Sequence, residues 1–249
     1  MDKRGRVQWG DCVTGIKICG IRRAEDIEAV NRVLPDYIGF VFAKSRRQIE
    51  AKTAAMLKEK LDDRIEAVGV FVNQEISLIS SLYKKGIIDI AQLHGDEDEE
   101  YIAELKETCG CRVIRSVGLP VQAESVGGHE SVYNLQFTVY SLQCTVSGGQ
   151  CTGAGARGPG DGRVLADYVL FDTASEQRGG TGKVFDWKRL KGYRGPPFFL
   201  AGGLTAMNVV EAVRGLAPFA VDVSSGVETD GSKDEGKIIE FVKTVRGMK

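Results

Sequence analysis

Eight short apolar runs, separated by longer amphipathic stretches, limit the folds that this chain can adopt. The runs are rich in Val, Ile, Phe and Tyr, and most lack the polar alternation of a half-exposed strand. Continuous apolar runs are typical of parallel strands that are covered on both faces. The predicted strands are Thr14–Cys19, Tyr37–Phe42, Ala67–Phe71, Ile88–Leu93, Arg112–Val117, Tyr168–Asp172, Phe198–Ala201 and Ala220–Val223.

Helical patterns lie between these runs, so strand and helix alternate along the chain. We predict helices at Ala24–Val33, Thr53–Leu61, Ile76–Lys84, Glu99–Glu107, Ala206–Arg214 and Gly236–Val245, with Asn73 and Thr205 as N-caps. This alternation predicts an α/β fold. A closed (β/α)₈ barrel typically takes about 250 residues, which suits residues 1–249 as one TIM-barrel domain. An open doubly wound sheet is the alternative.

Residues 119–163 break the alternation where the fifth helix is expected. They include a glycine-rich stretch, Ser147 to Gly162, that is unsuited to a helix. A long loop without secondary structure is uncommon in a compact domain. We therefore expect residues 119–163 to be a disordered insertion in place of, or near, the fifth helix.

Charge balance and composition exclude several classes of protein. Lys and Arg total 33 and Asp and Glu 34, so no net charge would draw the chain to nucleic acid or a membrane surface. No run approaches the roughly 20 apolar residues of a membrane helix, and the polar first residues do not resemble a signal peptide. We therefore expect a cytoplasmic protein. The six cysteines and two histidines lack metal-ligand spacing, so no metal site is expected.

Cys19 and Asp172 end the first and sixth predicted strands. In a closed parallel barrel the carboxyl ends of all strands open into one mouth, where barrel enzymes carry their active sites. A thiol and a carboxyl there are candidates for a base and an acid. Cys19 alone would more often be a small buried hydrophobe, whereas Asp172 is costly to bury unless it is paired or solvated. His94 ends the fourth strand and is either a helper of this pair or an ordinary hydrogen-bonded residue.

Three glycine-rich loops follow the last three predicted strands and are typical of a phosphate site. Glycine lets backbone N–H groups approach an anion closely, and the loops after strands 7 and 8 of a barrel commonly bind phosphate. A short helix beginning near Gly226 would point its N-terminus at the ligand. The residues expected to bind substrate here are Gly180, Thr181, Gly182, Gly202, Gly203, Asp222, Ser224 and Ser225.

The basic segment Lys44-Ser45-Arg46-Arg47 follows the second predicted strand. One interpretation is a solvated loop, as most charged runs are. The other is that one guanidinium reaches over the mouth and binds a carboxylate through two hydrogen bonds. The segment alone does not decide between them.

In their order and spacing these motifs closely resemble the phosphoribosylanthranilate isomerase family of tryptophan biosynthesis. The matching segments are Lys17–Ile21, Gly39–Phe42, Ser45–Arg47, Val68–Asn73, Gln92–Gly95, Leu170–Thr173, Gly179–Trp187, Ala201–Leu204 and Asp222–Glu228. Residues 119–163 depart from the family's pattern.

The resemblance implies a (β/α)₈ barrel that acts without a cofactor. Its reaction would be the Amadori rearrangement of N-(5-phosphoribosyl)anthranilate to 1-(2-carboxyphenylamino)-1-deoxyribulose 5-phosphate. By the same resemblance, Cys19 is the general base, Asp172 the general acid and Arg47 the residue that binds the anthranilate carboxylate. The expected partner is this small phosphosugar, bound by a monomer or a homodimer, with no nucleic acid and no membrane involved.

Two alternatives stay open at the level of sequence. A related phosphosugar isomerase or epimerase would place an acid where Cys19 stands, or carry metal-binding acids and histidines at its strand ends. A barrel that binds phosphate without catalysis would keep only the fold, and the presence of Cys19, Arg47 and Asp172 argues against it.

Overall fold

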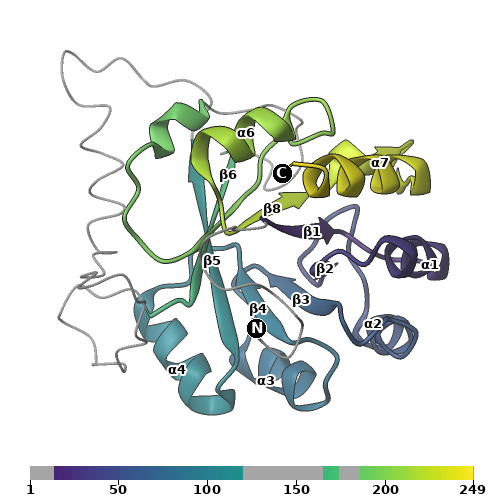
Figure 1. The fold of residues 1–249 in the computed structure, drawn as a ribbon. Helices are drawn as coiled ribbons and strands as arrows, with labels where there is room; N and C mark the ends of the chain where they lie inside the picture. The colour runs from purple at the N-terminus through teal and green to yellow at the C-terminus, as the bar shows by residue number, and fades with distance from the viewer. Residues whose placement is uncertain (1–13, 120–164, 174–185, 249) are drawn as a thin grey trace.

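The computed structural model describes residues 14–119, 165–173 and 186–248, and within them eight parallel strands close into one barrel (Figure 1). Neighbouring strands follow the order of the sequence, and β8 closes the barrel against β1. The strands are β1 Gly15–Cys19, β2 Tyr37–Val41, β3 Glu66–Phe71, β4 Ile90–Leu93, β5 Arg112–Leu119, β6 Tyr168–Thr173, β7 Phe198–Leu200 and β8 Ala220–Val223.

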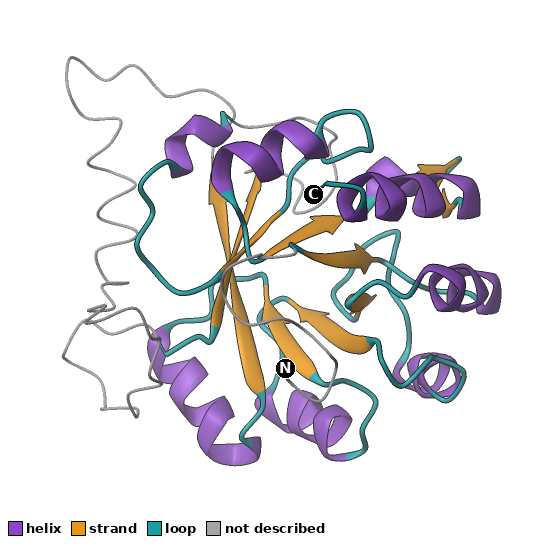
Figure 2. Ribbon diagram, viewed as in Figure 1, coloured by secondary structure: helices purple, strands orange, loops and turns teal. Residues whose placement is uncertain are grey.

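Helices surround the barrel on its outer face (Figure 2). The described ones are α1 Ala24–Val33, α2 Ala51–Lys58, α3 Ile76–Lys84, α4 Glu99–Cys109, α6 Val209–Leu216 and α7 Glu235–Arg246. Two short 3₁₀ turns, η1 Trp187–Leu190 and η2 Ser225–Val227, and a small hairpin of β9 Glu228–Thr229 and β10 Ser232–Lys233 complete these elements.

Two layers of apolar side chains hold the fold together. The larger layer fills the space between the strands and the helices and includes Ile18, Val30 and Phe241. The smaller layer fills the barrel interior, where the Tyr37 and Phe199 rings pack edge to face. Because side chains alternate across a strand, each strand supplies both layers, and its inward residues near the carboxyl end line the mouth.

The structure confirms the closed parallel barrel and places each predicted strand with its ends shifted by no more than one or two residues. One boundary is a correction: Leu119, predicted as the start of the insertion, ends β5 and pairs in register with Thr173. The rest of the predicted insertion, with the expected fifth helix, lies outside the described residues.

Both predicted N-caps were wrong. Glu75 precedes α3, while Asn73 adopts a left-handed φ of 48° and its Oδ1 accepts a hydrogen bond from the Asp96 N–H at 2.8 Å. Asn208 precedes α6, and its Oδ1 accepts from the Thr205 N–H at 2.8 Å. Asn73 thus joins two loops at the mouth instead of capping a helix.

Candidate active site

Cys19 ends β1 and faces the mouth beside Val41 and Val70. Its register partner on β2 is Gly39, where a Cβ atom would lie 2.7 Å from the Cys19 sulfur. Glycine at that position therefore makes room for the thiol. Cys19 is only 9% exposed, so few water molecules can reach the sulfur.

Lys17 lies two residues before Cys19 on the same face of β1 and is fully buried. Its ammonium donates a hydrogen bond to Asp222 Oδ2 at 2.9 Å, and the two residues are register partners on β1 and β8. The other oxygen, Asp222 Oδ1, is buried and has no hydrogen-bond partner in the described structure. Lys17 was not among the site residues predicted from the sequence. A charge inside an apolar strand was the signal, because such a charge is rarely buried unpaired.

Burial and the nearby ammonium groups have opposite effects on the pKa of the Cys19 thiol. Burial raises the pKa of Cys19 above its ordinary value, and the Asp222 carboxylate adds to this effect. The ammonium groups of Lys17 and Lys233 act in the opposite direction. Burial prevails, so the free protein holds Cys19 as a thiol beside two cations that favour the thiolate.

Asp172 lies near the end of β6, and one of its oxygens accepts a hydrogen bond from the Thr173 N–H at 2.7 Å. Burial raises the pKa of this carboxyl from 3.8 to about 6, although that hydrogen bond opposes the shift. Gly202, with a φ of 86°, follows β7 at close range, since a Cβ there would lie 3.2 Å from Asp172 Oδ1. A carboxyl with this pKa is partly protonated near neutral pH, as a general acid must be.

His94 lies beside Asp172 at the end of β4. Its Nε2 is 3.9 Å from Asp172 Oδ2, and its Nδ1 is 3.2 Å from the side-chain nitrogen of Gln92. Gln92 also contacts the Ser116 hydroxyl at 3.3 Å. The structure therefore brings the predicted helper histidine to the predicted acid, through a buried glutamine that sequence reasoning did not single out.

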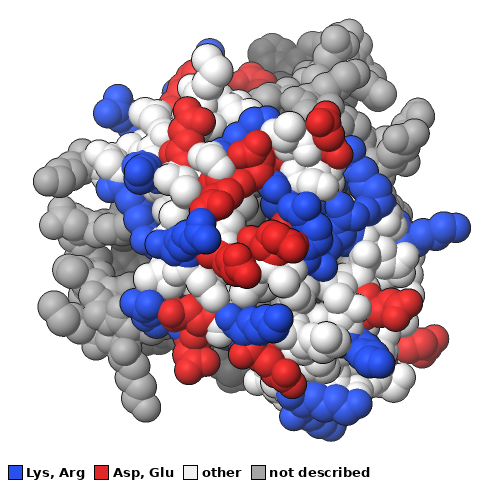
Figure 3. All heavy atoms as spheres, turned by 90° about the vertical axis from the view of Figure 1, so that its right-hand side faces the viewer, with Lys and Arg blue, Asp and Glu red and all other residues white. Residues whose placement is uncertain are grey.

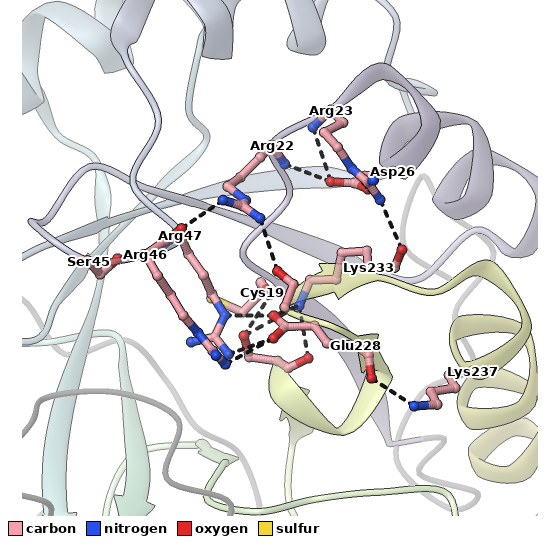
Figure 4. Close-up of polar contacts among 12 residues, drawn as sticks. Cys19, Arg22, Arg23, Asp26, Ser45, Arg46, Arg47, Glu228, Lys233 and Lys237 are labelled. Atoms are coloured by element: carbon pink, nitrogen blue, oxygen red, sulfur yellow. Dashed lines mark hydrogen bonds and ion pairs between the residues drawn. The ribbon is translucent and has the colours of Figure 1, made fainter.

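Arg47 is buried, which rules out the solvated-loop interpretation for this residue. Its Nε and Nη2 donate to the two carboxylate oxygens of Glu228 at 2.7 and 2.9 Å. Lys233 donates to Glu228 Oε1 at 2.9 Å, and Figure 4 shows these side chains gathered next to Cys19. Glu228 and Lys233 were also missed by the sequence analysis, because their partner Arg47 comes from a distant loop.

The loops after β7 and β8 pack tightly together at the mouth. A Cβ on Gly226 would lie 1.9 Å from the Leu204 carbonyl oxygen, so only glycine fits there. Ser224 donates its hydroxyl proton to the Cys19 carbonyl at 3.0 Å, which ties β8 to β1. Ser225 begins η2, the short helix expected near Gly226. Gly203 lies in the loop after β7 with a φ of 66°.

The remaining predicted phosphate residues, Gly180, Thr181 and Gly182, lie outside the described residues. No group of three or more His, Cys, Asp or Glu side chains suited to a metal ion occurs within residues 14–119, 165–173 and 186–248. None of the helices in the described part of the chain has the length and apolar character of a membrane span. On the face in Figure 3, basic and acidic side chains are interspersed, as the near-neutral net charge suggests.

Comparison with known proteins agrees with this geometry. The family model of N-(5'-phosphoribosyl)anthranilate isomerase matches residues 16–150 and 162–244. The departure from the family that was predicted for residues 119–163 is therefore limited to residues 151–161. N-(5'-phosphoribosyl)anthranilate isomerases of Endomicrobium trichonymphae and Clostridium acetobutylicum are 44% and 42% identical to the chain, each over 94% of this chain and 98% of the relative.

Solved structures show the same likeness. The phosphoribosyl anthranilate isomerase of Thermotoga maritima superposes with a TM-score of 0.72 at 31% identity, over 94% of this chain and all of that one. A phosphoribosyl anthranilate isomerase in complex with reduced 1-(o-carboxyphenylamino)-1-deoxyribulose 5-phosphate superposes with a TM-score of 0.69 at 30% identity, over 94% and 100% of the two chains. The chain therefore belongs to the N-(5'-phosphoribosyl)anthranilate isomerase family.

Proposed function

We propose that the mouth of this barrel isomerises N-(5'-phosphoribosyl)anthranilate to 1-(2-carboxyphenylamino)-1-deoxyribulose 5-phosphate, a step of tryptophan biosynthesis, with Asp172 as general acid and Cys19 as general base. The observation that carries the proposal is the position of these two groups. They lie at or next to the carboxyl ends of β1 and β6 in one closed barrel, and the family to which the chain belongs is named for this reaction. The charges of Lys17 and Asp222 act on both groups.

The first step opens the furanose ring. Protonated Asp172 gives its proton to the ring oxygen while the bond from that oxygen to C1′ breaks, and the anthranilate nitrogen forms a Schiff base with C1′. The pKa of about 6 supports this role, because Asp172 is then still partly protonated near neutral pH, where an ordinary aspartate is almost fully ionised. His94, whose Nε2 is 3.9 Å from Asp172 Oδ2, orients the carboxyl.

The second step moves a proton from carbon. The cationic Schiff base makes the C2′ hydrogen acidic. After the thiol proton of Cys19 has passed to solvent at the mouth, the thiolate removes the C2′ proton and becomes the thiol again, which leaves an enolamine that tautomerises to the ketose. Lys17 and Lys233 balance the thiolate charge. Ring opening also places a cation near the sulfur, which offsets the effect of burial on the thiol. Proton transfers by such positioned groups contribute about 10²–10⁴-fold each.

Substrate binding is assigned to groups around this pair. Arg47 binds the anthranilate carboxylate. The loop backbone at Gly202, Gly203, Ser224 and Ser225, together with Gly180, Thr181 and Gly182, binds the phosphate, since glycine-rich loops after strands 7 and 8 suit an anion. Asp222, whose Oδ1 has no partner in the described structure, accepts a hydrogen bond from a sugar hydroxyl.

One barrel supplies all the described residues of this site, so a monomer and a homodimer would both be active. The Thermotoga maritima relative is described as dimeric, and monomers of it have been generated. A phosphosugar intermediate of amino-acid biosynthesis supports a cytoplasmic location.

A direct test is to mix the purified chain with freshly prepared N-(5'-phosphoribosyl)anthranilate and follow formation of the ketose product. We expect catalytic turnover without added metal or organic cofactor. Binding of the substrate with no product formed would contradict the proposal.

A further inference from the structure

Glu228 is a buried carboxylate surrounded by cations. Its side chain is 5% exposed, and it contacts Arg47 through two hydrogen bonds, Lys233 at 2.9 Å and Arg46 at 3.1 Å. Burial alone would raise its pKa, but the Arg47 hydrogen bonds and the Lys233 charge lower it to about 2. Glu228 is therefore a permanent anion inside the protein at physiological pH.

The way in which Glu228 binds Arg47 leaves one edge of the guanidinium unused. A guanidinium has five N–H donors in a fixed plane. Glu228 takes the Nε–H and one Nη2–H, which form the side edge. The end edge, formed by Nη1 and the second Nη2–H, has no hydrogen bond in the described structure. This edge alone can bind a second carboxylate with two parallel bonds.

Arg47 is also fixed along its length. Its Cδ lies 2.6 Å from the position that a Cβ on Gly20 would take, so the Arg47 side chain packs directly against Gly20, the residue after Cys19. Its own N–H donates to Ser45 Oγ at 3.1 Å. Arg22 donates to the Arg46 carbonyl at 2.7 Å and thereby holds the same loop. The guanidinium is thus positioned before any ligand arrives.

Lys233 gives the cluster formed by Arg46, Arg47, Glu228 and Lys233 the positive charge that attracts an anion. An isolated pair of Arg47 and Glu228 would be electrically neutral. Lys233, with a side chain 2% exposed, adds a positive charge to the same carboxylate oxygen and is anchored to the Ser224 carbonyl at 2.9 Å. Arg46 adds another from the exposed side. Three cations, Arg46, Arg47 and Lys233, thus surround the one carboxylate of Glu228 (Figure 4), and their net charge is positive.

We propose that Glu228 is a positioning residue that sets the specificity of this enzyme for a substrate with an ortho-carboxylate. By occupying the side edge of Arg47, it leaves only the end edge for the ortho-carboxylate of the substrate. The inference rests on the proposed function, because it takes Arg47 as the group that binds the anthranilate carboxylate. It adds the reason that this arginine discriminates: the guanidinium can bind in one orientation only.

The test measures binding of two probes by calorimetry. One is the reduced product, 1-(o-carboxyphenylamino)-1-deoxyribulose 5-phosphate, and the other is its phenylamino analogue prepared from aniline, which lacks the carboxylate. The proteins are the full chain, Glu228→Gln, Glu228→Asp, Arg47→Ala and a matched control, Glu235→Gln. Glu235 is also ion-paired with an arginine, Arg32, but both of these side chains are exposed and neither contacts Arg47 or Glu228 in the described structure.

In the unmodified chain we expect the carboxylated probe to bind about 10- to 100-fold more tightly than the phenylamino analogue, because one bidentate charge-assisted contact contributes about that much. This ratio of the two affinities is the quantity compared among the variants. Glu228→Gln should lower this ratio as much as Arg47→Ala, to within about threefold of unity, with the affinity for the analogue unchanged. Glu228→Asp should lower the ratio partially, and Glu235→Gln should leave it intact.

Equal weakening of both probes by Glu228→Gln, or an unchanged ratio, would overturn the inference and leave Glu228 a structural residue. Failure of both Glu228 variants to fold would do the same. A ratio near unity in the unmodified chain would instead contradict the role of Arg47 in the proposed function, so the two failures can be told apart.

Discussion

The Lys17 ammonium donates a hydrogen bond to Asp222 Oδ2 at 2.9 Å, and the two residues lie opposite each other where β8 closes the barrel against β1. Lys17 is fully buried and the Asp222 side chain is 8% exposed. Their charges act on both Cys19 and Asp172, which otherwise come from strands far apart in the barrel. This pair thus links the fold of the barrel to the electrostatics of the proposed acid and base.

Lys17→Met should be strongly destabilising, because it leaves the Asp222 carboxylate buried without its partner. Removing one member of a buried ion pair costs about 3–5 kcal/mol. The free energy of unfolding from urea titration measures the effect. Lys58→Met is the matched control, since the Lys58–Asp89 pair is partly exposed to solvent and its loss should cost only about 1 kcal/mol. Equal losses in the two variants would contradict a special role for the buried pair.

Asp172→Asn should stabilise the protein at alkaline pH while it removes turnover. The folded state raises the pKa of Asp172 from 3.8 to about 6, so the folded state binds this proton more tightly than the unfolded chain. That contribution to stability is complete below pH 3.8 and is lost as the pH rises through 6. An amide stays neutral throughout, so the variant should gain as much as about 2–3 kcal/mol over the unmodified chain at pH 8 and little at pH 4.

Unfolding titrations at several pH values between 4 and 8 measure this difference. Asp63→Asn, at an exposed aspartate, is the control and should not reproduce the gain in stability that we expect for Asp172→Asn at pH 8. A flat difference for Asp172→Asn would mean that the carboxyl has an ordinary pKa, and would remove the support for its role as an acid.

Gly39→Ala should disturb catalysis by displacing the Cys19 thiol. The new methyl would lie 2.7 Å from the sulfur and 3.0 Å from the Cys19 Cα, so the thiol must move. Gly69→Ala is the matched control on the next strand, because its methyl would meet the Phe71 ring at 2.7 Å and not the mouth. Both should lose about 1–3 kcal/mol of stability. Only Gly39→Ala should lower kcat, by about 100-fold, and similar kcat values in the two variants would argue against the position assigned to the sulfur.

The alkylation rate of Cys19 should keep rising beyond pH 9, because burial raises the pKa of its thiol. Mass spectrometry after iodoacetamide treatment gives the rate at each cysteine separately. Cys109, partly exposed at the end of α4, is the internal reference, and the reduced product should protect Cys19 but not Cys109. A rate at Cys19 that levels off below pH 8 would indicate a preformed thiolate and contradict the thiol that we assign to the free protein.

The fold was largely predictable, because the local periodicity of apolar residues indicates where its strands and helices lie. The helices Ala24–Val33 and Ile76–Lys84 begin and end where predicted. The N-caps failed because tertiary contacts decide them: Asn73 uses its side chain on Asp96, from another loop, and not on the helix that follows it.

The site was predictable only in part. Position at the ends of strands identified Cys19, Asp172 and His94. The contacts that tune them were not visible, because Lys17 meets Asp222 and Arg47 meets Glu228 only after the barrel closes. The sequence identifies the individual charged residues but not which of them pair in the folded protein. These pairs determine the electrostatics at the mouth of the barrel.

The central claim is that Cys19 and Asp172 carry out the proton transfers. The most direct measurement is the single-turnover rate of N-(5'-phosphoribosyl)anthranilate isomerisation by the unmodified chain, Cys19→Ser and Asp172→Asn, with binding of the reduced product as a check on the site. We predict that each variant binds the reduced product but isomerises the substrate at least about 100-fold more slowly. A rate within about threefold of the unmodified chain in either variant, with binding intact, would contradict the role assigned to that residue.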